Sequence, residues 1–383
     1  MKIARVATVP FFLYNHLRRQ AADTARAGHE VVLVSSGGPE VKGLEQIDGV
    51  RFVQVGIQRR ISPINDLVSL WRLFRLFRRE RFDIVHTTTP KAGMLGAVAA
   101  FLARVPIRLH TFTGQAWAEM RGLERQLAKL GDQLTVALDT RCYADSLSQR
   151  DFMVDEAVAR RDEIHILGAG SLAGVDLERF SDGNPPADTG ERLRALGVPD
   201  GHLIITFIGR ITADKGVREL IESFRALQAQ DFPCTLLLIG PEEPDASQLY
   251  QTTRLADLPH VHRLGYQPDP ERWLALTDIF CLPSYREGFG NVVIEAAAMG
   301  VPTVGTDIPG LRDAVVHNET GILVPVRNVP ALTRALAELL VDGAMRSGMG
   351  ARACRRAREQ FDASKINALL IEEYGALRRG YVP

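Results

Sequence analysis

The sequence predicts an α/β protein of two similar domains, each a parallel, doubly wound sheet covered by helices. At 383 residues the chain is too long for one ordinary hydrophobic core. Short β-rich runs alternate with helical patterns from end to end, and such alternation indicates parallel strands joined by crossover helices. The alternation restarts after a polar stretch containing Gly and Pro at 170–190, which we interpret as the connection between the domains.

The first half of the chain predicts a complete α/β domain. Its strands are short apolar runs such as "AGHEVVLVS", in which Gly28 ends the preceding helix before the valines begin. We expect strands at 2–9, 27–35, 49–56, 82–88, 107–114, 141–146 and 163–170, and helices at 13–27, 63–81, 92–103 and 123–140.

The second half repeats the pattern with six strands. We expect these strands at 203–209, 234–240, 261–265, 278–284, 302–306 and 321–325. The helices are expected near 189–196, 216–230, 245–257, 270–276, from about 291, and at 310–316, 329–341, 344–360 and 364–379.

These elements predict the domain boundaries and the binding region. We place an N-terminal domain at 1–178, a C-terminal domain at 179–362, and a helix that packs back on the N-terminal domain at 363–383. Ligands of open α/β sheets bind outside the carboxyl ends of the strands. Two such domains facing each other therefore predict a central cleft.

Composition and charge narrow the class of protein. Residues 1–120 contain 17 Lys and Arg against 9 Asp and Glu, which indicates an anionic partner for the N-terminal half. The four cysteines are scattered without a CxxC or Cys/His pattern, which favours a reducing cytoplasm over disulfides or a zinc site. The best candidate for a membrane span, 92–103, has 12 residues and falls short of the roughly 20 required.

The segment "REGFGNVVIEAAAMGVPTV" (286–304) carries the most informative functional pattern. Glu287 follows a buried strand beside Gly288 and Gly290, and Glu295 lies about one turn into the next helix. The glycines permit close backbone approach, and the helix start offers N–H groups to a phosphate. Glu287 can therefore meet a transferred sugar while Glu295 accepts hydrogen bonds from a ribose diol. The alternative, a helix cap and an exposed helix residue, is disfavoured by the glycines.

A second pattern, "FIGRITADKGVREL" (207–220), places two cations at the end of a strand. Arg210 and Lys215 flank a loop that runs from Gly209 to Gly216 before a helix. Two cations and a helix N-terminus suit a diphosphate, because charge-assisted hydrogen bonds are strong. The alternative is a pair of solvated loop charges.

Together these segments resemble the retaining, group 1 nucleotide-sugar glycosyltransferases of the GT-B fold. The E-x7-E stretch and the GR…KG loop carry the resemblance, and "GLRDAVVHNETGILVP" (310–325) and "GSLAGVDLERF" (170–180) extend it over nearly the whole chain. The segment 86–114 is also similar to the bacterial branch that adds sugars to polyprenyl-diphosphate-linked saccharides. The resemblance implies the GT-B fold, two Rossmann-like domains facing a central cleft.

The resemblance also implies a role for each matching residue. Arg210 and Lys215 would bind the donor diphosphate and stabilise the leaving group, Glu287 would contact the donor sugar and phosphates, and Glu295 the ribose. His110, at the end of "IRLH", would lie next to the transferred sugar, although a lone His can equally be structural. Members keep the anomeric configuration by front-face attack, so no protein nucleophile is expected. The other residues implied at the donor are Gly209, Phe289, Gly290 and Asn291.

The loop after the first strand departs from the family pattern. Many members carry glycines there, whereas "TVPFFLYNHL" (8–17) has none. Phe11 and Phe12 can therefore face an apolar acceptor or pack internally, and Lys91 and Thr113 are further candidates for acceptor contacts. No D-x-D tripeptide occurs, so no metal is expected, and the two cations of the GR…KG loop would take its place.

The stretch 63–81 predicts a basic amphipathic helix. Such a helix can lie on an anionic membrane surface, which would suit a lipid-linked acceptor. The alternative, which we favour, is a crossover helix packed on the sheet with a solvated basic rim. The apolar stripe comprises Leu67, Leu70, Trp71, Phe74 and Phe77, and Arg72, Arg75, Arg78 and Arg79 lie to its sides.

These features predict a cytoplasmic glycosyltransferase on the inner face of the cytoplasmic membrane. It would move a hexose or N-acetylhexosamine from a nucleoside-diphosphate donor to a lipid-linked saccharide, with no nucleic-acid partner. Two alternatives stay open, a nucleotide-sugar 2-epimerase of the same fold and a non-catalytic scaffold of a glycan-assembly complex. A dinucleotide oxidoreductase is disfavoured, because no G-x-G-x-x-G follows the first strand.

Overall fold

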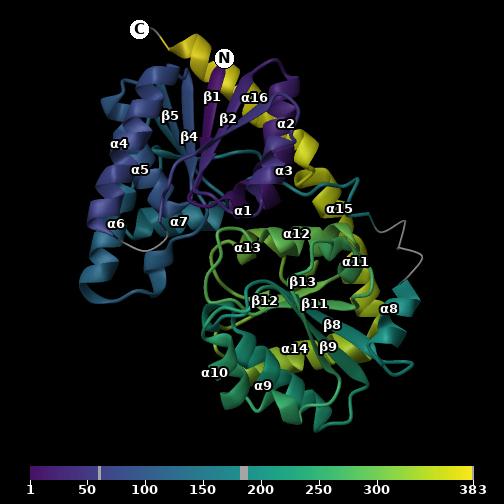
Figure 1. Cartoon of the computed structure of the whole chain (residues 1–383). Coiled ribbons are helices and arrows are strands. Elements are labelled where there is room, and N and C mark those ends of the chain that lie inside the picture. The colour runs from purple at the N-terminus through teal and green to yellow at the C-terminus, as the bar shows by residue number, and fades with distance from the viewer. Residues whose placement is uncertain (59–61, 182–188, 382–383) are drawn as a thin grey trace. The chain divides into compact units, whose positions relative to one another are not determined.

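The computed structural model describes residues 1–58, 62–181 and 189–381, which form two compact units (Figure 1). The first unit joins Met1–Gly174 to Ala363–Pro383, and the second is Val175–Asp362. The division thus falls a few residues before the boundary expected at 178, and the C-terminal helix belongs to the first unit. Of the expected linker, residues 182–188 lie outside the described part of the chain.

The first unit contains a seven-stranded sheet in which all neighbouring strands are parallel. The strands are β1 (Lys2–Val6), β2 (Glu30–Ser35), β3 (Val50–Gln54), β4 (Ile84–Thr88), β5 (Ile107–Phe112), β6 (Arg141–Ala144) and β7 (Ile164–Ile166). Their order, β3-β2-β1-β4-β5-β6-β7, reverses direction between β1 and β4. Strand β2 is buried along nearly its whole length and appears in the sequence as a nearly continuous apolar run, whereas β1 and β4 carry buried polar residues such as Arg5 and His86.

Helices cover both faces of this sheet. They are α1 (Pro10–Phe12), the π-helix η1 (Leu13–Leu17), α2 (Arg18–Arg26), α3 (Val41–Glu45), α4 (Pro63–Glu80), α5 (Pro90–Leu102), η2 (Ala116–Glu119), α6 (Gly122–Leu138), α7 (Leu147–Asp155) and α16 (Ala363–Gly380). In β2, Val32 and Val34 belong to the core cluster that includes residues of α4 and α5, whereas Val31 and Leu33 belong to the cluster that includes Ala21 of α2, because successive side chains point to opposite faces. Helix α5 packs between α4 and α6, so that the three lie side by side (Figure 1).

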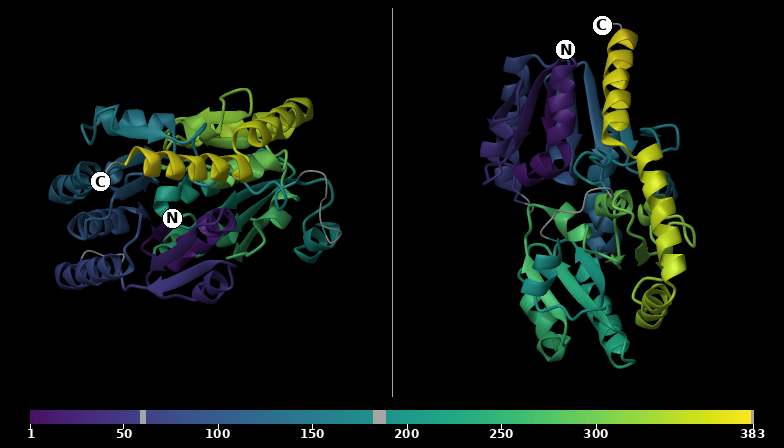
Figure 2. Two further views of the ribbon diagram at one scale, coloured as in Figure 1. Left: turned by 90° about the horizontal axis from the view of Figure 1, so that it is seen from above. Right: turned by 90° about the vertical axis from the view of Figure 1, so that its right-hand side faces the viewer.

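Helix α16 packs on the face of the first sheet that also carries α2. Leu370 and Tyr374 are buried against β-strand residues such as Ile3, and Figure 2 shows α16 running along this unit. The hydroxyl of Tyr374 lies 2.7 Å from both Nη1 of Arg5 and Nδ1 of His86. Burial, followed by the charge of Arg5, holds the pKa of His86 well below its usual value, so the imidazole is neutral in this network.

The second unit contains a six-stranded parallel sheet of order β10-β9-β8-β11-β12-β13, which reverses direction between β8 and β11. Its strands are β8 (Leu203–Ile208), β9 (Cys234–Ile239), β10 (Val261–Gly265), β11 (Ile279–Leu282), β12 (Thr303–Thr306) and β13 (Gly321–Val324). Its helices are α8 (Thr189–Ala195), η3 (Ala213–Lys215), α9 (Val217–Gln228), α10 (Ala246–Thr252), η4 (Leu255–Asp257), α11 (Pro270–Leu274), α12 (Asn291–Ala298), α13 (Leu311–Ala314), α14 (Val329–Val341) and α15 (Gly343–Gln360).

The expected fold class, two Rossmann-like parallel sheets, is confirmed, and every expected strand is present. Two helices, α3 and α7, were not expected from the sequence. The glycine-free segment 8–17 is mostly not a loop, because the chain is helical from Pro10 onward.

The expected packing of the basic helix is wrong in part. In α4 the buried face consists of Ser69, Leu73, Leu76 and Phe77, because these positions turn toward the sheet and α5. Of the expected stripe, Phe77 is buried and two residues are half-buried, whereas Leu67 is 67% and Trp71 55% exposed. Helix α4 therefore has two apolar faces, and only one of them belongs to the core.

Candidate active site

Two loops from neighbouring strands form the candidate site of the second unit. The loop 209–216 follows β8 and the loop 283–290 follows β11, and these strands are paired where the strand order reverses. The backbone N–H of Tyr285 donates to the carbonyl of Asp214 at 2.9 Å and links the two loops. Open α/β sheets bind ligands at such a reversal, so the fold brings both sequence motifs to the expected position.

The two loops approach closely because Gly216 has no side chain. Its φ of +67° lies in the left-handed region, and a Cβ there would lie 2.0 Å from the carbonyl oxygen of Pro283. Gly216 is also the N-cap of α9, and Gly290, with a φ of +83°, is the N-cap of α12. The N-termini of two helices, which carry partial positive charge, therefore begin at these loops.

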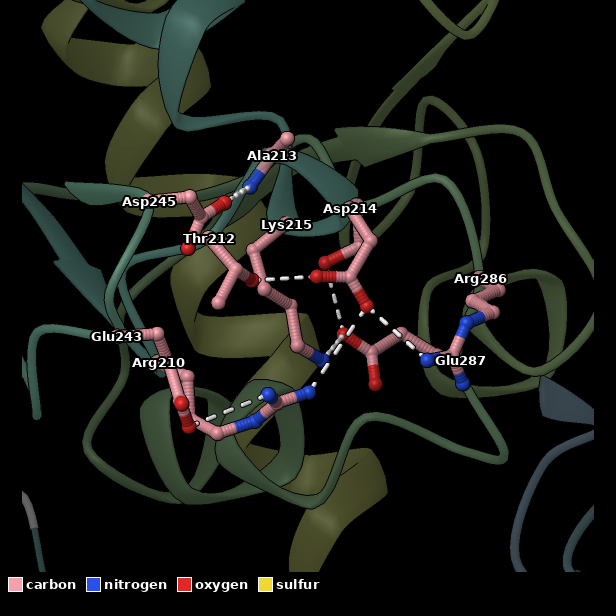
Figure 3. Close-up of polar contacts among 10 residues, drawn as sticks. Arg210, Thr212, Ala213, Asp214, Lys215, Glu243, Asp245, Arg286 and Glu287 are labelled. Carbon is pink, nitrogen blue, oxygen red and sulfur yellow. Dashed lines mark hydrogen bonds and ion pairs between the residues drawn. The ribbon is translucent and has the colours of Figure 1, made fainter. Parts of the chain in front are cut away.

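Lys215 and Glu287, one from each loop, point toward one another (Figure 3). The Lys215 ammonium lies 2.5 Å from Oε1 of Glu287, and the Ser284 hydroxyl donates to the same oxygen at 2.7 Å. Both charged side chains are less than one-fifth exposed, at 17% and 13%. The structure thus joins two residues that lie far apart in the sequence.

Arg210 lies between two carboxylates in the same cluster (Figure 3). Its Nη1 is 3.5 Å from Glu243 and its Nη2 is 3.8 Å from Asp214. Arg286 reaches the same Asp214 oxygen at 3.1 Å, and the Thr212 hydroxyl donates to the other oxygen. Burial alone would raise the pKa of Asp214, but the Thr212 hydrogen bond and the cations Arg286, Arg210 and Lys215 hold it below its usual value.

The sequence did not single out Arg286 and Asp214. Both lie inside the recognised motifs, each directly before a residue that was singled out, but a surface Arg or Asp has no distinguishing signal by itself. Only the pairing of β8 with β11 shows that Asp214 binds two arginines at once. The cluster can present three cations, already oriented by hydrogen bonds, to an anion of two phosphate groups.

Glu295 occupies a different environment on α12. It is half-buried, and the charged groups that act on it are Arg179 and Glu271, which form an ion pair with an N–O distance of 2.7 Å. Desolvation raises the pKa of Glu295 to about 7, the Arg179 charge opposes this shift, and the Glu271 charge adds to it. The structure therefore places Glu295 beside the Arg179–Glu271 pair.

The other residues expected at the donor, Phe289, Asn291 and Gly209, lie in the two loops or directly beside them. Phe289 is 2% exposed as a whole residue and its ring packs 5.1 Å from that of Phe361, so it is enclosed in the core and its contact with a ligand stays a prediction. Asn291 is the first residue of α12, directly after the N-cap. Gly209 directly follows β8, and its N–H donates to the carbonyl of Ile239.

His110 is enclosed within the first unit. It is 1% exposed, its Nδ1 lies 2.7 Å from the Thr87 hydroxyl, and its ring packs against Phe112. A Cβ on Gly93 would lie 2.4 Å from the ring, so this glycine makes room for the imidazole. Burial lowers the pKa of His110 to about 3, so the ring is neutral, and its contact with a sugar stays a prediction.

The residues expected at the acceptor follow three strands of the first sheet. Phe11 is exposed, whereas Phe12 is half-buried and packs beside His16. Lys91, at the start of α5, forms an ion pair with Asp66 of α4 at 2.6 Å. The half-buried Thr113 directly follows β5. An acceptor phosphate at Lys91 would therefore compete with Asp66.

Thr89 is a residue of this region that the sequence did not single out. It follows β4 with a φ of 70°, unusual for a β-branched residue, and its hydroxyl lies 2.8 Å from that of Thr8, which follows β1. This contact sits where the first sheet reverses direction. Strained backbone of this kind concentrates at functional sites, and only the folded structure reveals it.

Two protein-family models match the chain. One, described as Glycosyl transferases group 1, matches residues 202–342, and the other, described as Glycosyl transferase 4-like domain, matches residues 15–170. The chain is 31% identical over 352 residues to the capsular polysaccharide biosynthesis glycosyltransferase CapM of Staphylococcus aureus, covering 91% of this chain and 90% of that protein. It is 28% identical to the Escherichia coli UDP-Gal:alpha-D-GlcNAc-diphosphoundecaprenol alpha-1,3-galactosyltransferase, covering 81% and 80%.

Solved structures agree on the fold. The Anabaena protein Alr3699/HepE, crystallised in complex with UDP and glucose, is similar with a TM-score of 0.82 and 19% identity, covering 98% of this chain and all of that one. A lipopolysaccharide-biosynthesis glycosyltransferase, WaaG, is similar with a TM-score of 0.72 and 16% identity, over 97% of this chain and 99% of its own. The chain therefore belongs to the group 1 glycosyltransferases, enzymes of the GT-B fold.

Proposed function

We propose that this enzyme is a retaining glycosyltransferase that moves a sugar from a nucleoside-diphosphate donor to a lipid-linked saccharide in surface polysaccharide assembly. One observation supports a nucleoside-diphosphate donor: Arg210, Lys215 and Arg286 lie together where the strand order reverses between β8 and β11. The acceptor class is supported by the lipid-linked saccharide in the name of the E. coli relative and by the capsular polysaccharide in that of the S. aureus relative.

The cations would act on the leaving group. As the bond between sugar C1 and the diphosphate oxygen breaks, negative charge grows on the diphosphate, and Arg210, Lys215 and Arg286 stabilise it from fixed positions. The acceptor hydroxyl forms the new bond to C1 on the same face, and its proton passes to the leaving diphosphate. Glu287, released from Lys215 when phosphate takes its place, would hold a hydroxyl of the donor sugar. No covalent sugar–enzyme intermediate is needed.

A donor screen tests the proposal. Each nucleoside-diphosphate sugar is mixed with a short-chain polyprenyl-diphosphate saccharide, and release of nucleoside diphosphate is measured together with the anomeric configuration of the product. We expect release to depend on the acceptor, and Arg210→Ala and Glu287→Ala to abolish it. Release of free sugar epimer without acceptor would favour the 2-epimerase. Near-wild-type transfer by both variants would show that Arg210 and Glu287 do not belong to the donor site.

We further propose that transfer needs no metal ion, because the three cations supply the positive charge at the diphosphate. Incubation with EDTA, followed by assay in chelator, is expected to leave kcat and the donor KM unchanged. The control adds Mg²⁺ back to the treated enzyme. A loss of activity on chelation that Mg²⁺ restores would contradict this prediction.

Glu295 predicts a specific pH dependence for donor binding. If its carboxylate accepts hydrogen bonds from the ribose diol, protonation removes acceptor capacity, and its pKa of about 7 places that loss near neutrality. We expect the donor KM to rise as the pH falls through 7, and the profile of Glu295→Gln to be nearly flat. Glu271→Gln should shift the midpoint downward, because it removes a negative charge that raises the pKa. Identical profiles for Glu295→Gln and wild type would exclude the ribose role.

The raised pKa of Glu295 also makes the folding stability depend on pH. Donor binding is expected to weaken as the pH falls, whereas the fold loses stability as the pH rises. The folded-state pKa of Glu295 is above its ordinary 4.5, so the protonated group stabilises the fold at low pH and that contribution is lost as the pH rises through 7. Glu295→Gln should therefore raise the Tm above pH 7 and change it little near pH 4. Thermal melting at both pH values separates this effect from donor binding.

For its location, we propose the inner face of the cytoplasmic membrane, where a lipid-linked acceptor and a nucleotide sugar meet. Within the described residues, no helix has the length and apolar character of a bilayer-crossing segment. Contact with the membrane would then be peripheral, and α4, with its exposed arginines, is the element for which the sequence leaves that role open.

A further inference from the structure

The helical layer α4–α5–α6 of the first unit exposes large apolar side chains. Ile64 of α4 is 78% exposed and Leu123 of α6 is 69% exposed, and they are not isolated. The exposed apolar residues are Ile64, Leu67, Val68 and Trp71 on α4, Phe101 and Leu102 on α5, and Leu123, Leu127, Leu130 and Leu134 on α6. We call these ten residues the apolar layer.

Helices α4 and α6 each contribute a stripe to the apolar layer, and α5 contributes its C-terminal end. The α6 leucines recur at intervals of four, three and four residues, which places them on one side of the helix. The opposite side of α6 is the buried one and includes Asp132 and Thr135. Helix α5 lies between α4 and α6 (Figure 1). Its half-buried Met94 and Val98 precede the exposed Phe101 at helical spacing. Ten exposed large apolar side chains on three neighbouring helices of a folded protein indicate an interaction site.

The charges around the apolar layer are mainly positive. Arg72, Arg75, Arg78 and Arg79 of α4 are all exposed, and the Arg75 guanidinium lies 4.6 Å from the centre of the Trp71 ring. The two acidic residues of α4 are already bound to cations, Asp66 to Lys91 and Glu80 to Lys2, Arg51 and Arg79. The partner that fits this face is therefore apolar at its centre and anionic at its surface.

Part of the apolar layer lies at the same edge of the first sheet as the residues expected at the acceptor. Helix α4 precedes β4, α6 follows β5, and both helices begin at the carboxyl edge of the sheet. Ile64 and Leu123 lie in their first turns, and Leu67 directly follows the first turn of α4, at the same edge as Lys91. A lipid tail extending from an acceptor at this edge would find the exposed apolar side chains next to it.

We propose that the apolar layer docks on an anionic phospholipid bilayer, with the α4 and α6 side chains entering the headgroup–acyl boundary and the α4 arginines binding lipid phosphates. The surface extends to α5 and α6 the membrane contact that the sequence leaves open for α4. Its biological purpose rests on the proposed lipid-linked acceptor. A second copy of the chain fits less well, because a symmetric contact through this face would bring two sets of four exposed arginines together.

Binding to vesicles tests the docking surface. Full-length protein is sedimented with vesicles of phosphatidylcholine alone and of phosphatidylcholine mixed with phosphatidylglycerol. We expect binding to the anionic vesicles only, weakened by salt. Leu127→Ser with Leu130→Ser, and separately Arg72→Gln with Arg75→Gln, should each lower the vesicle affinity by about tenfold or more. Val341→Ser, which removes a 76% exposed valine of α14 in the second unit, should leave it unchanged.

Two further measurements separate the possible outcomes. All variants should transfer sugar to a water-soluble short-chain acceptor at the wild-type rate, while losing activity on acceptor embedded in vesicles. Wild-type affinity of both double variants for anionic vesicles would overturn the docking surface, and so would a dimer in light scattering that the leucine variant dissociates. Vesicle binding without transfer to any acceptor would instead contradict the proposed function and leave the docking surface standing.

Discussion

Lys215→Ala is expected to lower kcat for sugar transfer by about 10²–10³-fold, the usual effect of removing one preorganised donor from a site of developing negative charge. Lys215 is the most enclosed of the three cations, at 17% exposed, and a charge removed from water acts more strongly on a ligand than a solvated one. Steady-state kinetics with saturating acceptor give kcat and the donor KM separately. We expect both to change, since the ammonium binds the diphosphate before and during transfer.

The same substitution removes the ammonium from the Glu287 carboxylate, which keeps the hydrogen bond from the Ser284 hydroxyl. Loss of a buried ionic partner costs about 1–3 kcal/mol of folding stability, so the Tm is measured beside the kinetics. Lys42→Ala, which removes an exposed lysine from α3, is the matched control and should alter neither quantity. A Lys215→Ala enzyme with wild-type kcat and KM would show that the diphosphate does not bind at this loop.

Gly216→Ala is expected to damage both stability and activity. An alanine at a φ of +67° costs about 1–2 kcal/mol, and its Cβ would lie 2.0 Å from the carbonyl oxygen of Pro283. A backbone carbonyl cannot rotate away as a side chain can, so the two loops must separate, at a further cost of about 1–3 kcal/mol. Displacing Lys215 relative to Glu287 by about 1 Å should lower kcat by about 10²-fold.

The chain offers a closely matched control for this substitution. Gly197 has a φ of +70°, and a Cβ there would meet no atom within 4 Å. Gly197→Ala therefore carries the same backbone strain without the collision, and it should lower the Tm by less and leave kcat unchanged. Equal losses of Tm and kcat in the two variants would mean that contact between the loops is not what positions Lys215.

Much of the fold could be predicted from local sequence. Strands such as β9 and β11 are buried along their whole length, so their residues are almost continuously apolar and stand out from the helices between them. Helices α3 and α7 were missed because few of their residues are buried, only Leu44 in α3. In α7 only Gln149 and Met153 are buried, which leaves too few apolar positions to define a helical period.

The candidate site could be predicted as two separate motifs, but not as one cluster. The glycines at 216 and 290 and the charged residues beside them are local signals, and they identified Lys215 and Glu287. The contact between those two side chains, and the binding of Asp214 to both Arg210 and Arg286, depend on β8 lying next to β11. That pairing spans some seventy residues of sequence, and no local pattern encodes it.

The sequence by itself determined the alternation of strands and helices, the two sheets, and which loops carry the charged residues of the site. These properties depend on burial and backbone conformation at single positions, which residue type controls directly. Only the tertiary structure decided that Glu295 lies beside Arg179 and Glu271, and that Leu67 and Trp71 face outward. The neighbours of a side chain are set by strand order and helix packing, so its pKa and its exposure follow from the whole fold.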